Sequence, residues 1–255
     1  MTVTTAVAGA LFLFLRWLQM QNVMQGVAPD ALVARSSPYN IAVLLAMVCA
    51  VLLAVFFTLR QRKGLTAPSG PAALGFGGAA YTALSVAVCA LLLIGAVLLL
   101  AKGSGSQKFL GFLLLFSDAA IARLTLGKNG ASGKYFRAVC AAFVTVVMSV
   151  WIIFDYKANA ENPQLWLFAP AILAFACSAL GFYYLAGYSF GRAKPARTLL
   201  VSQLATYFCL IAAAYPGTAQ GTAGQTLVFV ALALFFLLEA WSAAGNLYFD
   251  FDGNA

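Results

Sequence analysis

Long apolar stretches recur along the chain, separated by short polar or glycine-rich segments. A helix needs about 20 mostly apolar residues to cross the hydrocarbon core of a bilayer. Eight stretches approach this length, namely residues 3–20, 39–59, 79–101, 109–126, 135–154, 164–188, 196–215 and 225–243. The pattern predicts about eight transmembrane helices arranged as four antiparallel hairpins. We expect a single transmembrane domain over residues 1–255, with no soluble domain.

The spanning elements are predicted to be helices, which makes the fold class all-α. A membrane β-barrel would show segments of about 10 residues with alternating polarity, whereas residues 86–100 carry no polar side chain at any position. Pro38, Pro163 and Pro195 lie close to predicted helix starts, where a missing backbone N–H costs little. The first and fourth spans have the weakest patterns, because the first contains Arg16 and the fourth contains Asp118 and Arg123.

The composition supports a membrane protein and excludes other classes. Hydrophobic residues make up 63% of the chain and charged residues 9%, against about 45–50% and about 25% in soluble domains. Disorder requires low hydrophobicity and high charge, so it is excluded as well. Five cysteines are too few, and odd in number, for a secreted disulfide scaffold.

The basic residues predict the orientation, because lysine and arginine in short loops are retained in the cytoplasm. Ten of the 15 basic residues fall on one face of the membrane, after the second span, around the turn between the fourth and fifth spans, and between the sixth and seventh: Arg60, Arg62, Lys63, Arg123, Lys128, Lys134, Arg137, Arg192, Lys194 and Arg197. We therefore expect both termini in the cytoplasm. The compact loops and the alanine- and leucine-rich spans favour a bacterial inner membrane. Arg16 is expected to snorkel to the headgroups. Topology and anionic lipids account for the net charge of +8, so no nucleic-acid partner is expected.

Several kinds of chemistry lack their usual residues. The chain has no histidine, and its five cysteines lie in five different predicted spans without metal-binding or redox spacing. No glycine-rich phosphate loop followed by lysine is present. We expect neither a cofactor nor a metal site.

Two of the seven acidic residues, Asp118 and Glu239, fall within predicted spans; the others, including Asp155, fall in predicted loops or the tail. A carboxylate in hydrocarbon is costly, so each is a candidate functional residue. Both are expected in the cytoplasmic third of their helices, with Arg123 and Arg137 near the same depth as counter-charges. In one interpretation they bind an ion, a proton or a cationic substrate. In the other, which the scarcity of acids favours, they form interhelical salt bridges.

The sixth span carries the most varied residues. Pro170 is expected to kink it, and glycines and tyrosines follow. These residues either line a ligand pocket or form a helix-packing face with an interfacial aromatic belt, which is the simpler interpretation. The residues concerned are Pro170, Gly181, Tyr183, Tyr184, Gly187 and Gly191.

These observations favour a non-enzymatic integral membrane protein. It would be either a small transporter-like protein or a membrane-embedded subunit that packs against other subunits or a second copy of itself. One alternative is a lipid-acting enzyme within the bilayer, which would have to use Asp118, Glu239, tyrosines or lysines. The other alternative is a purely structural or assembly protein. The lipid bilayer is the one partner that all three share.

Overall fold

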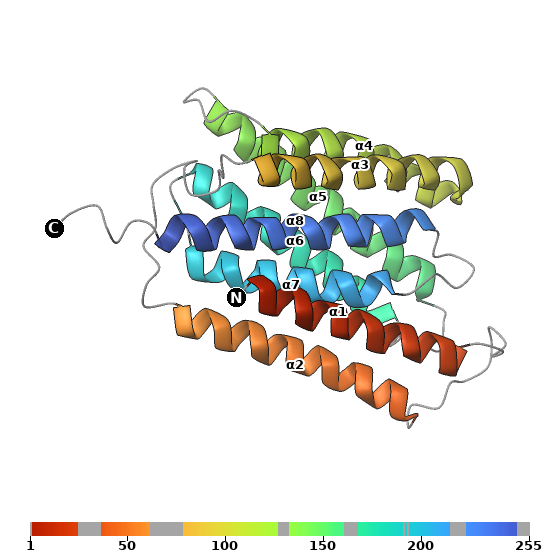
Figure 1. Ribbon diagram of the computed structural model, residues 1–255. Helices are drawn as coiled ribbons and strands as arrows, with labels where there is room; N and C mark the ends of the chain where they lie inside the picture. The colour runs from red at the N-terminus through yellow and green to blue at the C-terminus, as the bar shows by residue number, and fades with distance from the viewer. Residues whose placement is uncertain are drawn as a thin grey trace.

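The computed structural model of the protein describes residues 2–24, 37–61, 79–126, 133–160, 168–190, 192, 194–214 and 223–248. It contains eight α-helices, which run roughly along one axis (Figure 1). Their bounds are α1 Thr2–Gln19, α2 Pro38–Gln61, α3 Ala79–Lys102, α4 Gly105–Leu126, α5 Gly133–Asn159, α6 Ala169–Ser189, α7 Pro195–Ala213 and α8 Ala223–Tyr248. A short π-helix, η1 Met20–Met24, follows α1. Each α-helix contains a stretch long and apolar enough to cross a membrane. The predicted all-α bundle of eight membrane-spanning helices is confirmed.

Two helix boundaries differ from the prediction in ways that matter for the site. Helix α5 continues to Asn159, so Asp155 lies within a helix and not in a loop. Helix α6 begins at Ala169, which places Pro170 in its first turn. A proline at this position removes no intrahelical hydrogen bond. The predicted kink at Pro170 is therefore wrong.

Helices α3 to α8 form a closed ring. Each packs against the next along the chain, and α8 returns to pack against α3. A close approach of the last pair is possible because two glycines face each other: a Cβ atom on Gly224 would lie 2.8 Å from the carbonyl oxygen of Gly95. Helices α1 and α2 pack on the outside of this ring, mainly against α7 (Figure 1). Helix α7 is consequently enclosed by four helices.

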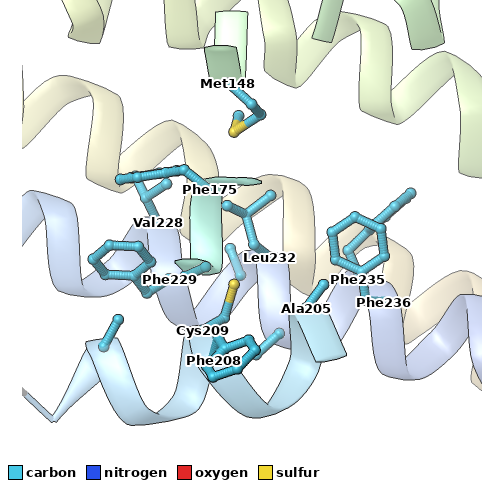
Figure 2. Close-up of a cluster of buried hydrophobic side chains, with 14 of the residues drawn as sticks. Met148, Phe175, Ala205, Phe208, Cys209, Val228, Phe229, Leu232, Phe235 and Phe236 are labelled. Carbon is cyan, nitrogen blue, oxygen red and sulfur yellow. The ribbon is translucent and has the colours of Figure 1, made fainter. Parts of the chain in front are cut away.

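The interior of the ring is filled by large aromatic side chains. Trp151 of α5 stacks on Phe175 of α6 with ring centroids 4.9 Å apart, and Phe175 lies 4.8 Å from Phe229 of α8. Figure 2 shows Phe175 and Phe229 of this layer, with Phe175 lying between Met148 of α5 and the side chains of α8. Because α5 and α8 are not adjacent in the ring, they are connected mainly by side chains that fill its interior.

Candidate functional site

A buried carboxylate marks one end of the bundle. Glu239 lies on α8, near the end where α1 begins and α8 ends, and is 5% exposed. The Tyr81 hydroxyl of α3 donates a hydrogen bond of 3.3 Å to its Oε1 atom. Its other oxygen, Oε2, is also buried and has no hydrogen-bond partner within the described part of the chain. A buried carboxylate oxygen without a partner is costly in an apolar interior.

Helix ends from four other elements surround Glu239, because antiparallel packing brings them to the same level. Tyr81 lies in the first turn of α3, Tyr188 in the last turn of α6 and Thr198 in the first turn of α7. Tyr188 is hydrogen-bonded to Thr198 and lies close enough to Glu239 to interact with its charge. With Arg137 of α5, these residues make up what we call the Glu239 site; all of them are buried.

Arg137 supplies the positive charge of the site. Its guanidinium interacts electrostatically with Glu239 and donates a hydrogen bond of 2.9 Å from Nη2 to the carbonyl oxygen of Leu124. Leu124 belongs to the last turn of α4, where carbonyl groups lack intrahelical partners and attract cations. Arg137 thus lies between two acceptors, the carboxylate of α8 and the C-terminus of α4.

Asp118 does not join the Glu239 site. Its carboxylate interacts with the Cys89 thiol of α3, eight residues beyond Tyr81. At about 1.5 Å per residue, the two acids therefore contact α3 at levels about 12 Å apart. The Arg123 guanidinium lies 6.0 Å from the ring centroid of Phe136, the residue before Arg137, so it is near the level of Arg137 without a described contact to Glu239. Of the four residues expected at one depth, the structure brings Arg137 to Glu239, keeps Arg123 near the level of Arg137, and places Asp118 at another level.

The residues singled out in the sixth span lie on different sides of α6. Tyr183 is 61% exposed and contacts Tyr184 edge-on, so this pair faces outward. Gly181 packs directly against the ring of Phe236. Gly187 lies in the last turn of α6, where its carbonyl oxygen accepts hydrogen bonds from the N–H groups of Phe190 and Arg192. Gly191 lies outside the described residues. The described contacts of Gly181 and Gly187 are thus with a neighbouring ring and with the end of their own helix, and Tyr183 is exposed.

A second polar pair lies at the opposite end of the bundle. Gln225 of α8 donates a hydrogen bond of 3.3 Å from Nε2 to Oδ1 of Asp155 on α5. Helices α5 and α8 are therefore linked by a hydrogen bond at this end and by the electrostatic interaction between Arg137 and Glu239 at the other. Asp155 follows Arg137 by 18 residues, about five helical turns, and Glu239 follows Gln225 by 14, about four turns. Each helix thus presents both of its polar residues on one face.

We call these two faces, with the side chains between them, the seam. Its middle contains only apolar side chains in the described structure: Val144, Met148 and Trp151 on α5, and Phe229, Leu232 and Phe236 on α8, all of them buried. Sequence reasoning missed the seam because it treated Asp155 as a loop residue and did not consider Gln225, Tyr81 or Tyr188. The helical spacing of Arg137 and Asp155 is the signal from which part of it could have been found.

Arg16 belongs to a separate polar network at the end of the bundle opposite Glu239. It is 2% exposed and donates a hydrogen bond to Oε1 of Gln19. The Gln19 amide in turn donates a hydrogen bond of 2.5 Å to Oδ1 of Asn40. The expectation that Arg16 snorkels to the headgroups is wrong. Arg16 is instead buried, and the hydrogen bonds that run from it through Gln19 to Asn40 link α1 to α2.

Known proteins add no information about the site. No family model, no curated protein and no solved structure matches this chain.

Proposed function

We propose that this protein is a small, non-enzymatic membrane transporter in which an ion or small polar solute moves along the seam between α5 and α8. One observation carries the proposal: the same two helices hold a polar pair at each end of the bundle, with an apolar layer between them. Polar and ionisable groups are costly within a membrane, and where they occur they commonly mark substrate or ion pathways.

The packing around the seam supports such a movement. Helix α5 packs mainly against α4 and α6, and α8 mainly against α3 and α7. The backbones of α5 and α8 are therefore not in close contact, and side chains fill the space between them. Trp151, Phe175 and Phe229 form a continuous aromatic contact across the middle. Rotation of these rings would open or close the layer without separating neighbouring helices. A carrier needs an internal barrier of this kind, which closes one end while the other is open.

We further propose that the Glu239 end of the seam faces the cytoplasm, with the protein in a bacterial inner membrane. Helix α1 begins and α8 ends at this end of the bundle (Figure 1). Seven of the ten basic residues assigned to the cytoplasmic face fall within the described structure, near helix ends at this same end of the bundle, and such residues are retained in the cytoplasm.

Cysteine labelling tests whether the seam opens to water. In a background without the five native cysteines, Val144→Cys places a thiol on the seam and Val146→Cys places one on the outer face of the same helix. Val144 is fully buried, whereas Val146 is 59% exposed and faces the surroundings of the bundle. Both substitutions replace the same residue type, so each is the control for the other.

We expect a charged, membrane-impermeant methanethiosulfonate reagent to modify Val144→Cys and to leave Val146→Cys unmodified. A thiol reacts as the thiolate, which forms in water and not in lipid. If Val144→Cys is as unreactive as Val146→Cys from both sides of the membrane, the seam stays dry and a transport path along it is refuted. The polar pairs would then serve only to lock the helices together.

A further inference from the structure

The Glu239 site has the composition of a proton-binding site. Its carboxylate is buried within a bundle that spans the membrane, one oxygen accepts a hydrogen bond from Tyr81, and the other has no partner in the described chain. An oxygen with this surrounding has an open position for a hydrogen atom. Because the carboxyl group becomes a hydrogen-bond donor when it is protonated, Oε2 is the atom at which a proton would be held.

The charged and titratable groups around Glu239 are few. Tyr81 faces it from α3, Arg137 from α5 and Tyr188 from α6, and α7 contributes the uncharged Thr198. Helix α1 also packs against α8, but its only charged side chain, Arg16, lies near the opposite end of that helix. Arg137 is therefore the one cation shown to act on Glu239.

The Arg137 guanidinium has a second acceptor besides the Glu239 carboxylate. It already donates to the carbonyl oxygen of Leu124, in the last turn of α4. An unpaired charge in an apolar interior is much more costly than a paired or neutral group. Whenever the guanidinium moves toward α4 and away from Glu239, the carboxylate has to be neutralised in another way. A hydronium ion from the aqueous phase achieves this: one of its O–H bonds breaks, the O–H bond of the carboxylic acid forms, and a water molecule is released.

We propose that Glu239 reversibly binds a proton in exchange for its interaction with Arg137, and that the proton is the ion coupled to movement along the seam. The coupling rests on the transport function proposed above. Proton binding by Glu239 does not, and can be measured in a protein that transports nothing.

The composition of the chain makes this measurement selective. The sequence contains two glutamates, Glu161 and Glu239. In a Glu161→Gln variant, labelling glutamate with carbon-13 at Cδ leaves one labelled carboxyl group, that of Glu239. Its chemical shift distinguishes carboxylate from carboxylic acid, and the measurement does not require any change to the site. In purified protein reconstituted into lipid nanodiscs, we expect the signal to move from the carboxylate to the acid position as pH is lowered.

Two further variants examine the exchange. In Arg137→Gln, the signal should stay at the acid position over more of the pH range, because the proton no longer competes with the guanidinium. In Asp118→Asn, the titration should be unchanged, because Asp118 contacts a different level of α3. A signal that stays at the carboxylate position at every pH at which the protein remains folded would overturn the proposal and indicate a permanent ion pair.

The outcome can be separated from that of the cysteine experiment. If Glu239 titrates but Val144→Cys never reacts, the proposed proton site stands and the proposed transport path is refuted. If Val144→Cys reacts but the Glu239 carboxylate does not titrate, the transport path stands and the proposed proton binding is refuted.

Discussion

The two faces of α5 have similar hydrophobicity and different roles. On the inner face, Val144, Met148 and Trp151 are buried among the side chains of the ring. On the outer face, Val139, Val146 and Ile153 are 61%, 59% and 65% exposed. Both sets are apolar, and a simple division into apolar and polar positions does not separate them. In a soluble helix the exposed face would be polar.

The difference between the faces lies in how closely their side chains are packed and in the residues at their ends. Lipid tails are as apolar as leucine, so an outward-facing position needs only to be apolar. An inward-facing position must also fill a defined space, as Trp151 does against Phe175, whereas the aromatic Phe136 of the same helix is 56% exposed. The inner face alone ends in polar partners on another helix, Arg137 toward Glu239 and Asp155 toward Gln225. Matched substitutions on inner and outer faces test whether this comparison holds.

The largest expected effect comes from truncating the central aromatic of the inner face. Trp151→Ala should destabilise the protein by about 3–5 kcal/mol, because it leaves a cavity beside Phe175. Ile153→Ala, two residues away on the outer face, should cost much less, because lipid occupies the space. Unfolding of the reconstituted protein measured by steric trapping compares the two. Equal losses would show that the inner face is no better packed than the outer one.

A smaller effect is expected from adding one methyl group where α6 meets α8. A Cβ atom on Gly181 would lie 2.7 Å from Cζ of Phe236, a ring already enclosed by Phe182 and Phe235. Gly181→Ala should therefore cost about 1–3 kcal/mol through overpacking. Gly105→Ala is the matched control, since no atom lies within 4 Å of a Cβ there. Thermal unfolding in detergent would contradict the packing if Gly181→Ala were as stable as Gly105→Ala.

The smallest effect concerns one hydroxyl group. Tyr81→Phe removes the hydrogen bond to Glu239 and should cost about 1 kcal/mol. Tyr183→Phe removes a hydroxyl from a side chain that is largely exposed and should be nearly neutral. The comparison uses the same unfolding measurement for both variants. A neutral Tyr81→Phe would mean that the Tyr81 hydroxyl does not contribute to holding Glu239 in the folded protein.

The candidate site could be predicted from the sequence only in part. Glu239 and Arg137 were identifiable because charges are rare in such a chain, and rarity does not depend on tertiary structure. Asp118 did not join them, because a depth taken from loop positions is uncertain by a turn or more. Arg123 has the predicted depth, but its described contact is with Phe136 and not with Glu239. Asp155 was missed because the apolar run ends one residue before it, whereas the helix continues to Asn159.

The sequence by itself determined the environment of the chain and the number of its helices. Both follow from local properties: a run of apolar residues has to leave water, and its backbone can satisfy its own hydrogen bonds in lipid only as a helix. Which face of each helix turns inward was decided only by the tertiary structure. Lipid and the protein interior both favour apolar side chains. Which face turns inward therefore depends on the fit of side chains and on polar partners from other helices, as α3, α5, α6 and α7 provide around Glu239.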